Sequence, residues 1–212
     1  MLMSKADCQL AAAYGATGAF TNTGGSVSLA IYVAVSVRVG NCLGENKPAN
    51  AKHVAWLGFQ LAAFCGAVIS CLIYLFREWL AVKFSPGGEG SIVYQETVEA
   101  VPIVAIYYWL NSLCWGAWGI LQGQMRNALS TASLLFGVWM ISVPLSVVCV
   151  NHDWLGTDLG SKLQGVWWAS CAGEASIVVV MVAAIYMSNW EALAAVSHCV
   201  LRTSYKYIYM MM

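Results

Sequence analysis

The stretch CQLAAAYGATGAFTNTGGSVSLAIYVAVSV, residues 8–37, decides the fold because it contains no Asp, Glu, Lys or Arg. An α-helix needs about 20 apolar residues to cross the hydrocarbon layer of a bilayer, which is roughly 30 Å thick. Four further apolar spans follow along the chain. Only 9% of the residues are charged and 60% are hydrophobic, whereas a soluble domain carries roughly 25% charged residues. The sequence therefore predicts an integral membrane protein.

The apolar spans predict five transmembrane helices in a single membrane domain over residues 1–190. The spans are continuously apolar and do not alternate as barrel strands of about 10 residues do, so the predicted fold class is an all-α integral membrane bundle. Residues 191–212 contain no run long enough to cross, and we expect a cytoplasmic tail of interfacial or disordered character. The predicted helices cover residues 11–37, 53–76, 98–123, 128–150 and 165–188.

The distribution of basic residues predicts the orientation of the multi-pass chain. Arg38, Lys47 and Lys52 lie between the first two predicted helices, and an excess of Lys and Arg marks cytoplasmic loops. The segment Arg77–Glu99 is rich in glycine and glutamate, which predicts a turn on the opposite side. The same counting favours a cytoplasmic carboxyl terminus. The membrane, plasma, vacuolar or other organellar, stays open.

Enzymes and nucleic-acid-binding proteins are disfavoured as classes. The chain has no phosphate-binding glycine loop, no GxSxG and no HExxH motif, and its eight cysteines form no CxxC pair, so we expect no catalytic residues, no metal site and no cofactor. Ten basic residues balance ten acidic ones, so no basic surface suggests nucleic acid as a partner. A transporter, a channel or a scaffold all remain compatible with the composition.

One stretch carries a family resemblance. Residues 34–46, AVSVRVGNCLGEN, close the first predicted helix, and Ala51-Lys52 open the next. This pattern resembles the signature of the multidrug and toxin extrusion family of secondary antiporters. The resemblance covers residues 17–190. Its further landmarks, similar to those of the family and in the same order, are Val101-Pro102, Gly119–Gln124, Val143-Pro144 and Gly165-Val166-Trp167.

The resemblance implies a twelve-helix protein of two lobes that exports organic cations or related solutes against protons or sodium. The five predicted helices resemble the eighth to twelfth, so the chain is expected to be incomplete and inactive alone, with the amino-terminal lobe as a missing partner. Two alternatives stay open. The chain is a non-transporting truncated protein or scaffold, or two copies replace the two lobes.

Ion coupling requires an ionisable group in the membrane whose binding differs between two states. The family commonly has an acidic residue at the position that aligns with Asn111, and some members have another near Ala19. Gln122 stands where an Arg is usual. One acid remains inside a predicted helix, Glu174, and a charge at a helix centre costs about 2.5–3.5 kcal/mol on insertion. Glu174 is therefore a candidate ion or proton site. The alternative is a hydrogen-bonded glutamate that only packs.

The third predicted helix carries Tyr107, Asn111, Trp115 and Trp118 on one face, at the spacing of successive helical turns. This face is a candidate binding surface for an organic cation, which aromatic rings attract, and packing against neighbouring helices is the alternative. Threonine hydroxyls such as that of Thr17 are expected to serve interhelical hydrogen bonds.

Two glycine patterns are expected to be structural. In the loop motif Arg38, Gly40, Asn41 and Gly44, the arginine can snorkel to phosphates and the glycines permit a tight helix exit. Gly119 and Gly123 form a GxxxG pair, which predicts close helix packing.

Overall fold

The computed structural model describes residues 5–84, 92–151 and 159–211 and is helical almost throughout this part of the chain, with no strand in it. Five segments are long and apolar enough to cross a membrane: Gly24–Gly44, Pro48–Leu75, Val93–Gly123, Asn127–Asn151 and Gly160–Tyr186. This confirms the predicted all-α bundle. The helices are α1 (Lys5–Gly44), α2 (Pro48–Leu75), α3 (Arg77–Phe84), α4 (Ile92–Gly123), α5 (Asn127–Leu135), the π-helix η1 (Phe136–Ser142), α6 (Val143–Asn151), α7 (Leu159–Tyr186) and α8 (Trp190–Met211).

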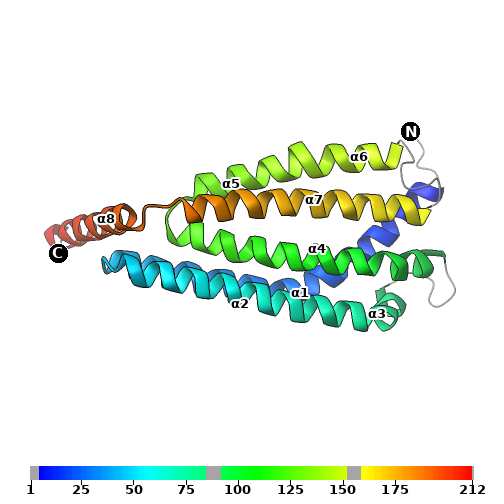
Figure 1. Cartoon of the computed structure of the whole chain (residues 1–212), viewed down its shortest axis with the longest axis horizontal. Helices are drawn as coiled ribbons and strands as arrows, with labels where there is room; N and C mark the ends of the chain where they lie inside the picture. Colours follow the sequence, from blue (N-terminus) through cyan, green and yellow to red (C-terminus); the bar gives the residue numbers. More distant parts are fainter. Residues whose placement is uncertain (1–4, 85–91, 152–158, 212) are drawn as a thin grey trace.

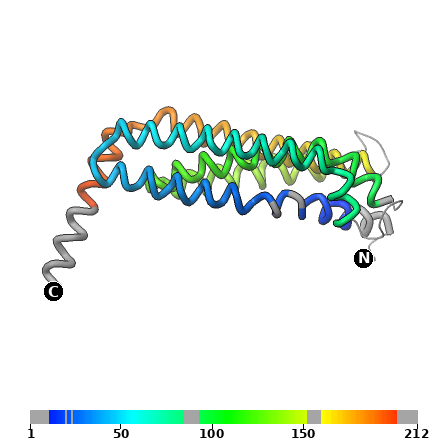
Figure 2. The backbone as a smooth tube through the Cα atoms, turned by 90° about the horizontal axis from the view of Figure 1, so that it is seen from below, coloured from blue at the N-terminus to red at the C-terminus, as the bar shows by residue number. Residues whose placement is uncertain are grey.

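The spans form one elongated bundle with α4 at its centre (Figure 1). Helix α4 contacts α1, α2 and α7, and it is the most buried of the five spans. The rod formed by α5, η1 and α6 packs against α7 on the far side from α2. The described chain starts at one end of the bundle and finishes with α8 at the other (Figure 2).

Glycines on α4 allow α1 to approach closely. A Cβ added at Gly119 would lie 2.8 Å from the carbonyl oxygen of Tyr32, and one added at Gly123 would lie 2.8 Å from that of Ser36. Real Cβ atoms do not come this near to a backbone oxygen. The GxxxG pair therefore serves helix packing, as predicted.

Helix α1 continues past its predicted end at Val37 as far as Gly44, so the loop motif lies mostly inside a helix. The chain reverses at Asn46, whose φ is 56°, and asparagine tolerates this left-handed conformation. The N–H of Asn46 donates to the carbonyl of Leu43 at 3.0 Å, and that of Lys47 to the carbonyl of Cys42 at 2.9 Å. This pair of bonds is a Schellman motif. Of the two glycines predicted to permit a tight exit, Gly44 is the last residue of α1, whereas Gly40 lies inside the helix against the Gly123 carbonyl.

The turn from α4 to α5 repeats this geometry. Met125 has a φ of 59°, its N–H donates to the Gln122 carbonyl at 3.0 Å, and the N–H of Arg126 donates to the Leu121 carbonyl at 2.9 Å. In each turn a basic residue follows the left-handed one, and the next helix starts at once. The bonds at Asn46 and Lys47 explain why α1 extends to Gly44, beyond its predicted end at residue 37, and why α2 starts at Pro48, before its predicted start at residue 53.

The fourth span is not a uniform α-helix. Pro144 has no N–H to donate, and its ring clashes with the carbonyl four residues earlier. The π-helix η1 lies directly before this position, and the N–H of Val143 donates five residues back, to Val138. The wider helical turn therefore accommodates the proline without ending the span.

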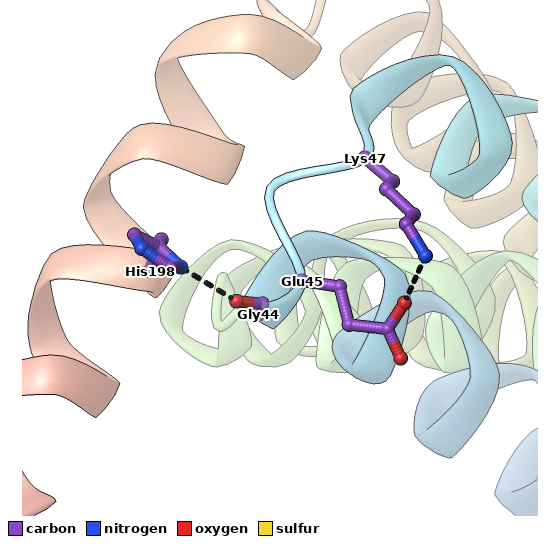
Figure 3. Close-up of polar contacts among 4 residues, drawn as sticks. All are labelled: Gly44, Glu45, Lys47 and His198. Carbon is purple, nitrogen blue, oxygen red and sulfur yellow. Dashed lines mark hydrogen bonds and ion pairs between the residues drawn. The ribbon is translucent and has the colours of Figure 1, made fainter.

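Two further helices occupy segments that were predicted as non-helical. Helix α3 fills the start of the predicted turn Arg77–Glu99, and α4 begins at Ile92, while residues 85–91 lie outside the described part. The predicted tail is helix α8, which begins with a buried Trp190 and buries Ala194 and Ser197 against the bundle end. Its His198 Nδ1 lies 3.0 Å from the carbonyl oxygen of Gly44, beside the exposed Glu45–Lys47 ion pair (Figure 3).

Candidate functional site

The carboxylate of Glu174 lies between α7 and α4. Asn111 donates from Nδ2 to Glu174 Oε1 at 3.1 Å, and the Tyr107 hydroxyl lies 3.5 Å from the same oxygen. Three of the candidate residues therefore come together, one from α7 and two from successive turns of α4. The carboxylate faces protein and not lipid, as the insertion cost of a charge requires.

The Glu174 side chain lines a small polar cavity and keeps its second carboxylate oxygen unpaired. Glu174 Oε2 is buried and has no hydrogen-bond partner among the described residues. The cavity has a volume of about 170 Å³ and is lined by Tyr14, Tyr107, Ser142 and Ser170 together with Glu174. A polar cavity of this size has room for water or a small ion. The arrangement therefore leaves one carboxylate oxygen available to a proton or a cation.

The close approach of η1 to α7 forms one wall of this cavity. A Cβ added at Gly173 would lie 2.7 Å from Cβ of Ser142 and 3.0 Å from the Gly137 carbonyl oxygen. Because Gly173 has no side chain, the π-helix can approach the helical turn that carries Glu174. Gly173, the residue before Glu174, therefore permits a close helix contact.

The aromatic residues on α4 continue the site toward the α1 side. Trp115 donates from Nε1 to Asn111 Oδ1 at 3.1 Å, so that the amide is held from both ends. The rings of Trp115 and Trp118 stack with centroids 5.3 Å apart. Tyr32 of α1 meets both rings edge to face, at 5.6 Å and 5.8 Å. The predicted face is thus continuous, and Tyr32 completes it.

The amino-terminal part of α1 reaches the other side of Glu174. Trp167 of α7 donates from Nε1 to Thr17 Oγ1 at 3.1 Å, which confirms an interhelical role for this threonine. The Trp167 ring stacks on Tyr14 and meets Tyr107 edge to face, each with centroids 5.1 Å apart. Tyr14 and Trp167 were not predicted as site residues. Trp167 lies seven residues before Glu174 on the same helix, a spacing that places both on one face and could have identified it. No spacing relates Tyr14 of α1 to Glu174.

The loop-motif residues lie elsewhere. Arg38 and Asn41 are exposed near the Gly44 end of α1, where α8 contacts the bundle. The structure does not bring them to the Glu174 cavity. Their position agrees with the structural role expected of them.

The sequence was compared with known protein families and curated proteins. The sequence model of the MatE family matches residues 1–148. Protein DETOXIFICATION 51 of Arabidopsis thaliana is 28% identical over 159 residues, which are 75% of this chain and 28% of that protein. Multidrug resistance protein PmpM of Pseudomonas aeruginosa is 26% identical over 149 residues, 70% of this chain and 30% of that protein. The chain thus spans about a third of the length of such relatives.

Two solved structures share the fold. The crystal structure of the eukaryotic MATE transporter AtDTX14 superposes with a TM-score of 0.83 at 14% identity, over 92% of this chain and 42% of that one. An inward-facing multidrug resistance MATE family transporter of the MOP superfamily superposes with a TM-score of 0.72 at 18% identity, over 88% of this chain and 43% of that one. The five-span bundle therefore corresponds to part of a larger transporter fold.

Proposed function

We propose, because this chain belongs to the MatE family, that it forms one wall of a membrane exporter of organic cations and that Glu174 binds the coupling ion. The observation that carries the proposal is the Glu174 carboxylate itself. One oxygen accepts from Asn111 and Tyr107, the other is buried without a hydrogen-bond partner among the described residues, and the Glu174 side chain lines the polar cavity.

The position of Glu174 compensates for the residue at Asn111. The family resemblance leads us to expect an acid at 111, where this chain has an amide that cannot take up a proton. The Glu174 carboxylate approaches that amide from α7 within 3.1 Å. We infer that the ionisable group has moved across the helix interface and still lies at the same site.

The aromatic residues on α4 support an organic cation as the proposed solute. Trp115, Trp118 and Tyr32 form a group of rings next to the Asn111 amide, and such rings attract organic cations. Transport by alternating access needs a second wall around the site, which a longer polypeptide or a second copy of this chain would supply. The proposed driving ion is a proton or sodium, exchanged for the solute.

The test measures export of ethidium from efflux-deficient bacterial cells that express the chain, with an imposed proton or sodium gradient. We expect Glu174→Gln to abolish gradient-driven export, because the amide keeps the shape of the side chain and removes the charge. Glu99→Gln is the matched control, since Glu99 is an exposed carboxylate on α4 away from the cavity. Because the proposal needs a second wall, the same measurement is made with a longer polypeptide that supplies it. Export that equals the empty vector for both the unaltered chain and that longer polypeptide, with each protein present in membranes, would favour the non-transporting alternative.

A further inference from the structure

The two halves of α1 pack against different helices. The first half, residues 5–23, crosses α4 obliquely and reaches α7, where Thr17 accepts a hydrogen bond (Figure 1). The rest of the helix runs beside α2, where Val35 lies directly against Gly58. Helix α1 therefore changes its packing partner near its middle.

The first half of α1 is held by small side chains. Among its described side chains, only those of Ala13, Ala16 and Thr17 are buried. The second half buries larger apolar side chains, which are those of Ile31, Val35, Val39 and Leu43. Helices in lipid are held together by packing contacts, and a larger buried side chain makes more of them. The first half is therefore the more weakly attached of the two.

The middle of α1 has the features of a hinge. The Tyr108 hydroxyl donates to the carbonyl of Gly24 at 2.7 Å, which in a regular helix accepts from the N–H of Ser28. A Cβ at residue 24 would lie 2.8 Å from the Tyr108 ring, whereas one at Gly25 would have nothing within 4 Å. Paired small residues and a side chain that competes for the helical hydrogen bonds both favour bending. Helix α1 can therefore bend at Gly24-Gly25.

The first half of α1 covers the Glu174 cavity. Tyr14 lines this cavity and is 42% exposed, so its ring borders both the cavity and the surroundings. The other lining residues come from α4, η1 and α7. Tyr14 stacks on Trp167, which also donates to Thr17. These contacts attach the first half of α1 to α7 directly beside the cavity.

We propose that residues 5–23 of α1 form a gate over the Glu174 cavity, which turns about Gly24-Gly25 and is held closed by the hydrogen bond from Trp167 to Thr17. Loss of this bond lets Tyr14 move away from Trp167 and opens the cavity. The gate rests on the proposed function for the identity of what enters, an ion that binds Glu174. Its movement can be measured in a chain that does not transport.

The test measures how fast dicyclohexylcarbodiimide, an apolar reagent that modifies carboxyl groups, reacts with Glu174 in the purified chain, by mass spectrometry of the labelled peptide. Thr17→Val keeps the shape of the side chain and removes the acceptor, so the rate should rise roughly fivefold, as expected when the closed state loses one hydrogen bond. Thr21→Val is the matched control, because the Thr21 hydroxyl donates to Gly18 within α1 itself. Equal rates for the two variants would overturn the closing contact.

The hinge is tested with a second pair of variants. Gly25→Ala should lower the labelling rate roughly threefold, because alanine makes this part of the helix more rigid. Gly18→Ala adds the same methyl group within the gate, where it also has nothing within 4 Å, and should leave the rate unchanged. Equal rates for this pair would overturn the hinge.

Amide hydrogen exchange of the unaltered chain in detergent depends on no variant. Residues 25–28 should exchange faster than residues 16–20 and residues 31–35, since a hinge weakens the helix locally. A rate that falls steadily from residue 11 to residue 44 would indicate fraying from the helix end and would contradict the hinge. Export that survives Glu174→Gln would refute ion coupling at Glu174 and leave these results valid, so the two proposals fail separately.

Discussion

Asn111 donates a hydrogen bond to Glu174 at 3.1 Å and thereby joins α4 to α7. The same amide accepts from Trp115 at 3.1 Å. A single side chain thus connects the only carboxylate of the described cluster to the aromatic face. Substitutions of Asn111 and of Trp115 are therefore expected to change the unfolding temperature in different ways.

Asn111→Asp places a second carboxylate next to Glu174. Two carboxylates at this separation cannot both ionise without strong repulsion, so the variant should unfold at a lower temperature than the unaltered chain. The difference should grow from pH 5 to pH 8, because one shared proton relieves the repulsion at the lower pH. Thermal unfolding in detergent at both pH values checks this, with Asn50→Asp at an exposed position of α2 as the control. A pH-independent difference would contradict it.

Trp115→Phe keeps an aromatic ring against Trp118 and removes the N–H that donates to Asn111 Oδ1. An acceptor left unpaired in a buried place costs about 1–3 kcal/mol, and the unfolding temperature should fall accordingly. Trp118→Phe removes a similar area without a hydrogen bond to Asn111, so its effect should be smaller. Equal losses for the two variants would show that ring packing alone matters.

Gly119→Ala should destabilise the bundle. The added methyl group would lie 2.8 Å from the Tyr32 carbonyl oxygen, so α1 must move away from α4, and overpacking of this kind costs roughly 1–3 kcal/mol. Gly18→Ala is the control, because nothing lies within 4 Å of its added Cβ and alanine favours a helix by about 0.5–1 kcal/mol. The two substitutions should shift the unfolding temperature in opposite directions.

Arg126→Ala should lower stability by about 1.5–3 kcal/mol, the range for hydrogen bonds to charged groups. The half-buried guanidinium donates to Ser188 Oγ at 2.9 Å and to the Ala184 carbonyl at 3.3 Å, at the end of α7. Lys47 follows the equivalent turn after α1, but its side chain pairs with the exposed Glu45, at 2.7 Å. Lys47→Ala should therefore have little effect on the unfolding temperature.

The pH dependence of the Lys47 pair is a further control. The hydrogen bond that Lys47 donates to Glu45, and then the negative charge of Glu45, hold the pKa of Lys47 above its usual value. A raised lysine pKa stabilises the folded state fully below the unfolded pKa of about 10.4 and loses this effect only above it. The unaltered chain and Lys47→Ala should therefore show parallel unfolding curves between pH 5 and pH 9. Divergence in that range would indicate another titrating partner.

The five spans could be predicted because uncharged runs such as residues 8–37 have no stable place except the bilayer. Their ends could be predicted in part. The third predicted helix ends at residue 123, as α4 does, whereas the first was predicted to end at residue 37 and α1 continues to Gly44. The turn after α1 depends on left-handed backbone at Asn46 and the turn after α4 on the same backbone at Met125, and a methionine does not mark such a position in the sequence. Helix α3 escaped prediction because its eight residues mix charges with aromatic rings and it stands beside a glycine-rich segment.

The site could be predicted only in part, because the sequence pattern relates residues within one helix and not residues of two helices. Helical spacing relates Tyr107, Asn111 and Trp115 to one another, since one helix carries them all. It gives no information on which face of another helix lies opposite, so the contact of Asn111 with Glu174, and the roles of Tyr14, Tyr32 and Trp167, emerge only from packing. The π-helix η1, which precedes Pro144, forms the remaining wall of the cavity beside Glu174.

The number of spans has a consequence for any assembled form. Five crossings are odd, so the start of α1 and the whole of α8 belong to different aqueous compartments. A protease or an impermeant label supplied on one side can reach only one of these two ends. A further membrane segment joined ahead of α1 would therefore connect to it through a loop on the side of the membrane opposite α8.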